Sequence, residues 1–230
     1  RPSDRKEPTR IAWLQCVGSR DINRCDHAYC SAVCCMYAIK EAVIAKEHSH
    51  QDLDAAIFFM DMRTYGKDFE KYYVRAEKES GVRFIRSRIH SVEPLDNGDL
   101  RIAYATESGE IREERFDMVV LSVGLSPNRD IAELAEKLHI ELNQHQYAQT
   151  TSFAPVSTNR EGIYLCGVFQ GPKDIPQSVM EASAAAAASG QLLTSARGTL
   201  TRVKELPPER DVSEEPPRIG VFVCNCGINI

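Results

Sequence analysis

Several features that define large protein classes are missing from this 230-residue sequence. No apolar run approaches the roughly 18 residues that a membrane-spanning helix needs, and no signal peptide is visible. Positive charge is not in excess, and the net charge of −5 argues against nucleic acid or an anionic membrane surface as a partner. The histidines share no metal-binding spacing, and none forms a catalytic triad with a nearby serine or cysteine. The sequence therefore predicts a cytoplasmic protein without a membrane span.

The glycine-rich fingerprint of dinucleotide-binding folds, G-x-G-x-x-G, is also absent. A short apolar run at residues 11–15 predicts a buried strand, and residues 31–46 repeat apolar side chains at helical spacing. The loop between them is where a dinucleotide fold would carry the fingerprint, but it reads CVGSRD at residues 16–21. Thiols therefore occupy the place at which the positive end of a helix would meet a phosphate.

Cysteines are clustered at the start of the chain, which indicates metal chemistry in a reducing compartment rather than a disulfide framework. Cys16 ends the first strand, Cys30 precedes the predicted helix, and Cys34 and Cys35 lie in its first turn. Amide donors and the helix dipole at that turn favour thiolate over thiol. Spacing alone does not decide which four of the five cysteines bind a metal, but Cys25 lies in a polar loop and is interpreted as a spare thiol.

Four interpretations of these cysteines are open. They are an iron-sulfur site, a zinc site, a redox-active thiol pair at Cys34 and Cys35, or small buried apolar residues. Zinc needs four sulfurs about 2.3 Å from one point, which is awkward for adjacent helical residues whose side chains diverge. A four-iron cubane offers four separate attachment points and suits an adjacent pair better. The sequence therefore favours a cluster.

The remaining pattern predicts an α/β protein. Strands are expected at residues 53–60, 117–127 and 162–167, helices at 67–80 and 131–138, and a β-meander of four strands at 82–85, 90–93, 100–105 and 110–116. Asp61 follows the second strand and is interpreted as an ordering partner of Arg63. Cys166 is expected in the core of the strand at 162–167. A further helix of about fifteen residues is expected from Asp174 to a stop at Gly190.

Four segments of the chain resemble one known family. They read CVGSRD at residues 16–21, YCSAVCCMYAIKEA at 29–42, FFMDMRTYGKDFEKYY at 58–73 and GPKDIPQSVMEASAAAA at 171–187. Together they resemble the A subunits of heterodisulfide reductase and their bacterial relatives, which are flavin and iron-sulfur proteins. The resemblance implies a [4Fe-4S] cluster on Cys16, Cys30, Cys34 and Cys35. It also implies an oxidoreductase that uses FAD and passes electrons through clusters to partner reductase, hydrogenase or ferredoxin components.

The order of elements also resembles that of flavoproteins with two dinucleotide domains. The fold class expected is therefore a Rossmann-like domain, βαβαβ plus β-meander, followed by the carboxyl-terminal part of a flavin-binding domain. In related flavoproteins the later strand ends in Gly-Asp, but here Gly167 is followed by Val-Phe-Gln, so Gln170 is the candidate replacement for the acid. Lys173 is a candidate for stabilising a reduced, anionic flavin, against the alternative of a solvated lysine. The expected cofactor-binding residues are Gly124, Gly167, Gln170, Gly171, Lys173, Asp174, Ile175 and Pro176.

The predicted domain boundaries complete this interpretation. Residues 1–9 are a linker or the end of a preceding domain, 10–117 the Rossmann-like domain, 118–200 the flavin-domain part, 201–217 a linker, and 218–230 a strand that opens a following domain with Cys224 and Cys226. The functional prediction is an electron-transfer subunit that uses FAD and [4Fe-4S]. The alternative is a non-redox interaction domain stabilised by zinc on the same cysteines.

Overall fold

The computed structural model describes residues 1–2, 4–128 and 130–223, so Cys224 and Cys226 lie outside the described residues. The chain divides into two units, Arg1–Leu192 and Leu193–Ile230. In the second unit a short 3₁₀ turn, η2 (Thr194–Ala196), is followed by residues 201–223, which contain no helix or strand. The strand expected from residue 218 is therefore not formed up to residue 223. A strand needs a neighbour to pair its backbone groups, and this segment has none among the described residues.

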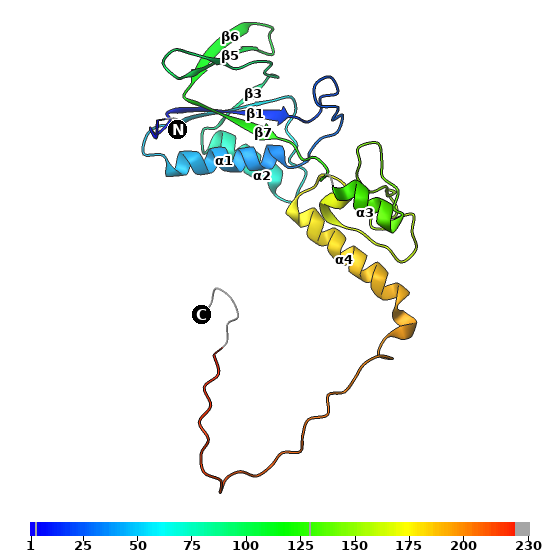
Figure 1. Cartoon of the computed structure of the whole chain (residues 1–230). Helices are drawn as coiled ribbons and strands as arrows, with labels where there is room; N and C mark the ends of the chain where they lie inside the picture. The colour runs from blue at the N-terminus through cyan, green and yellow to red at the C-terminus, as the bar shows by residue number, and fades with distance from the viewer. Residues whose placement is uncertain (3, 129, 224–230) are drawn as a thin grey trace. The chain divides into compact units, whose positions relative to one another are not determined.

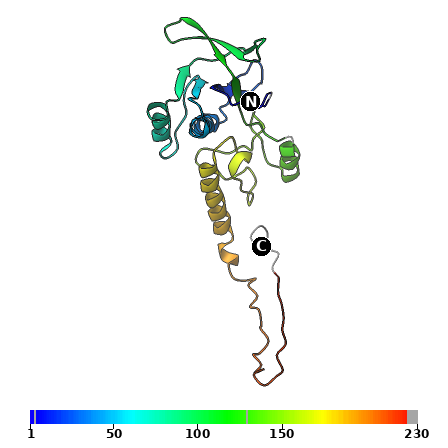
Figure 2. The same ribbon diagram turned by 90° about the vertical axis from the view of Figure 1, so that its left-hand side faces the viewer.

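The first unit is built around a parallel sheet of four strands in the order β3-β2-β1-β7. The strands are β1 (Arg10–Val17), β2 (Asp54–Phe59), β3 (Arg83–Arg86) and β7 (Met118–Val123). The helices α1 (Cys34–His48) and α2 (Phe69–Lys78) connect β1 to β2 and β2 to β3. Figures 1 and 2 show both helices on one side of this sheet. This is the βαβαβ arrangement predicted from the sequence.

A second sheet covers the other side. It is antiparallel, with the order β4-β5-β6, and consists of β4 (Glu93–Pro94), β5 (Leu100–Ala105) and β6 (Ile111–Phe116). The sequence assigned residues 82–85 to this meander, and that assignment is wrong. Those residues form most of β3, which pairs in parallel with β2. Residues 90–92 form no strand. Alternating side chains identify a strand but do not say which neighbour it pairs with.

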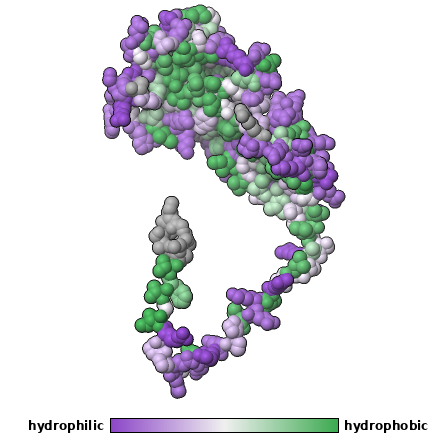
Figure 3. All heavy atoms as spheres, viewed as in Figure 1, coloured by the Kyte–Doolittle hydropathy of each residue, from purple (hydrophilic) through white to green (hydrophobic). Residues whose placement is uncertain are grey.

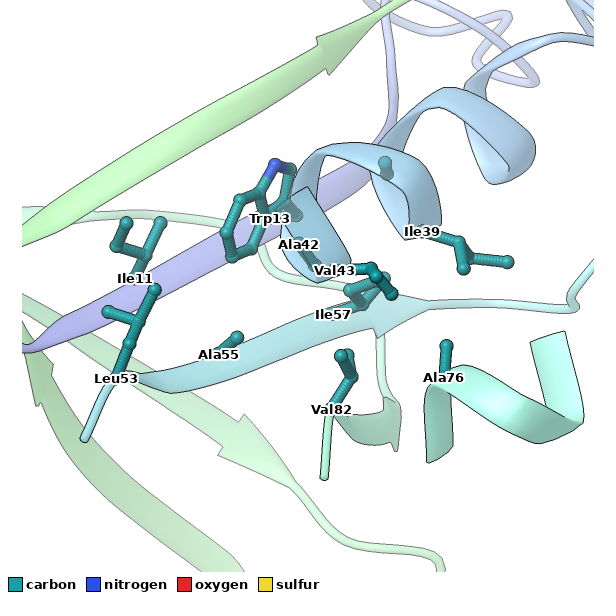
Figure 4. Packing of buried hydrophobic residues seen from close by; sticks show 11 residues of the cluster. Ile11, Trp13, Ile39, Ala42, Val43, Leu53, Ala55, Ile57, Ala76 and Val82 are labelled. Atoms are coloured by element: carbon teal, nitrogen blue, oxygen red, sulfur yellow. The ribbon is translucent and has the colours of Figure 1, made fainter. Parts of the chain in front are cut away.

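The core has one layer on each side of the parallel sheet. Between the sheet and the helices, Trp13, Ile57 and Ile39 of α1 belong to one buried apolar cluster, which Figure 4 shows in close-up. Between the sheet and the meander, Phe58 makes edge-to-face contacts with Tyr104 and Phe116. Each fully buried large side chain contributes about 1.5–3 kcal/mol relative to an exposed one. These two layers therefore fix the carboxyl ends of β1, β2 and β7, where the cysteine loop lies.

The last part of the first unit is mainly loop and helix. It contains α3 (Asp130–Leu138), the 3₁₀ turn η1 (Gly167–Phe169) and α4 (Ile175–Leu192). Residues 162–167 make only an isolated bridge, Ser157 to Tyr164, so the strand expected there is wrong. Cys166, expected in its core, is exposed. Neither expectation holds, because among the described residues no strand pairs with residues 162–167 beyond this one bridge.

The helix α4 begins as predicted and runs two residues past the expected stop at Gly190. Its surface is unusually apolar for a helix that buries so little. Ile175, Val179 and Met180 are 80%, 61% and 63% exposed, and Figure 3 shows apolar atoms along this helix. No helix among the described residues is both long and apolar enough to cross a membrane.

Candidate functional site

Four of the five clustered cysteines meet where β1 ends and α1 begins. Cys16 lies near the end of β1, where the pairing with β7 becomes irregular. Cys34 and Cys35 open α1, only 6% and 7% exposed, which confirms their predicted place in the first turn. Cys30 is half-buried in the loop before the helix. The helix starts three residues later than the sequence suggested, at Cys34 itself.

The backbone that holds these thiols adopts conformations that side chains rarely accept. Cys16, Arg20 and Ala32 have φ angles of 61°, 55° and 63°, in the left-handed region. For residues with a side chain this region costs roughly 1–2 kcal/mol each. Such residues persist only where the surrounding structure imposes them, and they gather at functional sites. Here three of them surround the cysteine loop.

Burial governs the pKa values of three of the thiols, those of Cys16, Cys34 and Cys35. It is the main cause that raises the pKa of Cys35 to about 11, and the thiols of Cys16, Cys30 and Cys34 add to the rise. Burial also raises the pKa values of Cys34 and Cys16, again with contributions from neighbouring thiols. The sequence predicted that the helix start would favour thiolate, and desolvation outweighs that effect. The same couplings establish that all four thiols are close to one another.

Two arginines place positive charge beside the thiols. Burial lowers the pKa of Arg63, but Cys30 and Asp61 outweigh it and raise the pKa overall. Arg20 acts on Cys16 in the opposite direction to burial and lowers the pKa of that thiol. Both guanidinium groups form ion pairs with Asp61. The predicted pairing of Asp61 with Arg63 is confirmed, and Asp61 orders Arg20 as well.

The thiols are neighbours, but they do not share one centre. Among the described residues, no three histidine, cysteine, aspartate or glutamate side chains converge closely enough to hold a single metal ion. Cys25 lies elsewhere in the loop and lines a cleft of about 480 Å³ with Arg24, Arg88 and His90. Of the group of four, Cys16 also lines that cleft.

Two buried serines fasten the cysteine loop to the end of β7. The hydroxyls of Ser19 and Ser31 lie 2.7 Å apart, and the backbone N–H of Leu125 donates to the Ser31 hydroxyl at 2.8 Å. Gly124 passes directly over them. A Cβ at Gly124 would lie 2.4 Å from the Ser31 oxygen, so any side chain there would displace the loop. The structure therefore gives Gly124 a packing role beside the cysteines.

A cavity of about 670 Å³ joins the cysteine region to the start of α4. Ala32 and Val33, next to the cysteines, line one part of it, and Arg63 and Tyr65 line another. The wall opposite is formed by four of the predicted cofactor-binding residues, Lys173, Asp174, Ile175 and Pro176. The sequence placed these groups more than a hundred residues apart along the chain, and the fold brings them to one space.

Lys173 is not the solvated lysine that was the alternative interpretation. It is 4% exposed, and its Nζ lies 2.6 and 2.5 Å from the two carboxylate oxygens of Glu181, which is 6% exposed. Nζ also donates to the Gln170 side-chain oxygen at 2.5 Å. Glu181 in turn accepts the backbone N–H of Gly167 at 3.0 Å. This buried network holds the turn η1 against α4.

The other predicted flavin residues surround this network. Asp174 caps α4, because its carboxylate accepts the backbone N–H of Gln177 at 2.9 Å, as expected from the sequence. Gly167 has a φ of 70°, which favours glycine. A Cβ added at Gly171 would meet no heavy atom within 4 Å. Ile175 and Pro176 are exposed.

Sequence reasoning missed three residues that the structure brings to the site. Glu181 was not singled out, although it is the only charged residue in the sequence of α4, which was a usable signal. Burial raises the pKa of the Tyr65 phenol, and the nearby negative charges of Cys30, Cys35 and Asp174 contribute to the rise. Tyr37 of α1 donates its hydroxyl to the backbone carbonyl of Val123 at the end of β7. It carries no local signal, because only the packing of α1 on β7 brings the two groups together.

Comparison with known proteins defines the class. The model of the pyridine nucleotide-disulphide oxidoreductase family matches residues 38–188, and the chain belongs to this family of FAD-binding, Rossmann-like oxidoreductase domains. Among solved structures, LpdA from Mycobacterium tuberculosis is similar at 16% identity and a TM-score of 0.49, covering 86% of this chain and 37% of that one.

Within that class the chain is a homologue of the A subunits of heterodisulfide reductase. It is 44% identical over 197 residues to the second iron-sulfur A subunit of the CoB–CoM heterodisulfide reductase of Methanopyrus kandleri, covering 84% of this chain and 30% of the relative. The match to the iron-sulfur A subunit of the same reductase in Methanocaldococcus jannaschii is 44% over 192 residues, 82% of this chain and 29% of the relative. The A subunit of the H₂:CoB-CoM heterodisulfide,ferredoxin reductase of Methanothermobacter thermautotrophicus is 40% identical over 192 residues, 81% of this chain and 28% of the relative. The chain thus spans less than a third of the length of these relatives.

Proposed function

We propose that this chain holds a [4Fe-4S] cluster on Cys16, Cys30, Cys34 and Cys35 beside one part of an FAD site, and that it conducts electrons between the two. It would act as part of a protein like the A subunits of heterodisulfide reductase, in a reducing compartment such as the cytoplasm. Its partners would be the other subunits of such a complex, with a hydrogenase or ferredoxin as further electron carrier. Relatives whose names describe iron-sulfur subunits and hydrogen- or ferredoxin-linked reductases support this assignment.

The arrangement of the thiols fits a cluster better than zinc. The four cysteines come from a strand, a loop and a helix start, so their side chains approach from different directions. They influence one another electrostatically without converging on one ion position among the described residues. A tetrahedral zinc site needs that convergence, whereas a cubane offers a separate iron to each sulfur. Arg20 and Arg63 offset part of the negative charge that deprotonated sulfurs would bring.

The residues around α4 fit the flavin end of FAD. The positive end of a capped helix suits the electron-rich edge of an isoalloxazine, and Lys173 adds a cation held in place by Glu181. Gly167 and Gln170 belong to the hydrogen-bond network that holds the turn η1 against α4. The chain contains no G-x-G-x-x-G, so it would contact the flavin end rather than the pyrophosphate.

The observation that carries the proposal is the shared cavity. Residues adjacent to the cysteines and residues at the start of α4 line the same space of about 670 Å³. Bound there, FAD would supply two-electron chemistry and the cluster one-electron chemistry. Arg63 and Tyr65 line this space as well.

The test is anaerobic reconstitution with iron and sulfide, followed by metal and sulfide analysis and electron paramagnetic resonance (EPR) spectroscopy. The wild-type chain should take up about four irons and give a reducible signal. Cys35→Ser should lose or alter that signal, while Cys25→Ser should keep it, since Cys25 lies outside the group. Stoichiometric zinc without iron uptake would instead support the interaction-domain alternative.

A further inference from the structure

A set of buried polar side chains lies beneath the first turn of α1, in a layer that is otherwise apolar. Gln15, next to Cys16 on β1, is 9% exposed, and Ser122 on the neighbouring strand β7 is fully buried. The Gln15 amide nitrogen donates to the Ser122 hydroxyl at 2.9 Å. Burying polar groups in an apolar layer costs free energy unless they are hydrogen-bonded, so the presence of this pair calls for an explanation.

The hydrogen bonds of this set run in one direction. An amide nitrogen only donates, so the Ser122 oxygen accepts from Gln15 and its own proton is free to point onward. Ser122 also lies beside Tyr37, because its neighbour in sequence, Val123, accepts the Tyr37 hydroxyl. The Tyr37 hydroxyl then donates to the backbone carbonyl of Val123 at 2.8 Å. The set thus leads from β1 through Ser122 to Tyr37 on α1, whose hydroxyl donates back to the end of β7.

The chain of donors ends beside a cysteine. The Cys34 sulfur lies 3.7 Å from the same Val123 carbonyl, so the thiol and the phenol share one acceptor. A sulfur that ligates a metal has no proton and turns from donor to acceptor. Once the Cys34 sulfur has lost its proton, it no longer donates to the carbonyl. The neighbouring Tyr37 hydroxyl is then the donor that can bond to this sulfur.

We propose that Tyr37 donates a hydrogen bond to the Cys34 sulfur in the cluster-bound protein and that Gln15 and Ser122 orient and polarise this donor. The inference rests on the proposed function, because it assigns a role towards the cluster named there. Tyr37 is a positioning residue that acts through Cys34. Hydrogen bonds to cluster sulfurs stabilise the reduced, more negative state and raise the reduction potential. Donors in series strengthen one another, so the whole set tunes that potential.

The experiment measures the midpoint potential of the reconstituted cluster in the full chain by an EPR-monitored redox titration. Tyr37→Phe removes the hydroxyl and keeps the ring, and the oxidised-to-reduced ratio at a fixed potential should rise about tenfold, which is a shift of about −59 mV for one electron. Ser122→Ala should shift the potential in the same direction by less. Tyr147→Phe is the control, because the Tyr147 hydroxyl likewise donates to a backbone carbonyl, that of Leu125.

The outcomes separate the inference from the function beneath it. Full iron content with an unchanged potential in both Tyr37→Phe and Ser122→Ala would overturn the hydrogen bond and leave the cluster in place. An equal shift in Tyr147→Phe would attribute the change to general loosening and overturn it too. A wild-type chain that takes up no iron would overturn both proposals. If Tyr37→Phe does not hold iron, the Ser122→Ala potential decides.

Discussion

The buried ion pair between Lys173 and Glu181 leads to a quantitative prediction. The pair is almost completely shielded from water, with side-chain exposures of 1% for Lys173 and 7% for Glu181, and the Lys173 ammonium lies within 2.6 Å of both carboxylate oxygens. Lys173→Met removes one partner and leaves a buried carboxylate with only the N–H of Gly167 and the amide of Gln177. Losing one partner of a buried pair costs about 3–5 kcal/mol. That is a large part of the free energy of unfolding of a typical domain, roughly 5–15 kcal/mol.

The assay is urea unfolding followed by circular dichroism. With a slope of roughly 1–3 kcal/mol per molar urea, Lys173→Met should lower the midpoint by about 1 M or more. Lys173→Met combined with Glu181→Gln should recover most of this loss, because the neutral amide needs no counter-charge and still accepts from Gly167. The exposed pair of Lys137 with Glu133, at 2.6 Å, is the control, and Lys137→Met should cost less than about 0.5 kcal/mol. Equal losses in the single and double variants would refute the reasoning, because the cost would then not come from an unpaired charge.

Two further predictions concern the cysteine loop and the sheet. Gly124→Ala places a methyl 2.4 Å from the Ser31 oxygen and should lower both stability and iron uptake in the reconstitution assay. Gly171→Ala, with open space around it, should change neither. Equal iron uptake in both variants would contradict the packing role of Gly124. Burial raises the pKa of Asp54, but the hydrogen bonds and positive charge of Arg83 and Arg10 together outweigh it and hold the pKa below the usual value near 3.9. The ionised Asp54 carboxylate therefore stabilises the fold at pH values above its usual pKa. This stabilisation is lost as the pH falls through the lowered pKa of the folded protein. In acid titrations of unfolding, Arg83→Met should weaken this pH dependence, and an unchanged acid slope would contradict it.

Local features of the fold were predictable where one segment contains the whole signal. The strand β1, the helix α1 and the capped start of α4 all follow from apolar spacing and from residues such as Asp174 at fixed positions. The pairing of strands from different segments was harder to predict from the sequence. The alternation at residues 82–85 identified a strand, but its partner β2 depends on which edge of the sheet is free. Residues 162–167 had the composition of a buried strand, yet no described neighbour pairs with them beyond one bridge.

The sequence by itself determined the chemistry that this chain can offer: which thiols stand at a strand end and a helix start, the absence of the phosphate fingerprint, and the cap of α4. These are set by residue type and spacing within one segment. Only the tertiary structure decided that Lys173 is buried against Glu181, that burial raises the pKa values of Cys34 and Cys35, and that Tyr37 and Cys34 share the Val123 carbonyl. Desolvation and hydrogen bonding depend on what packs around a group, and those neighbours come from distant parts of the chain.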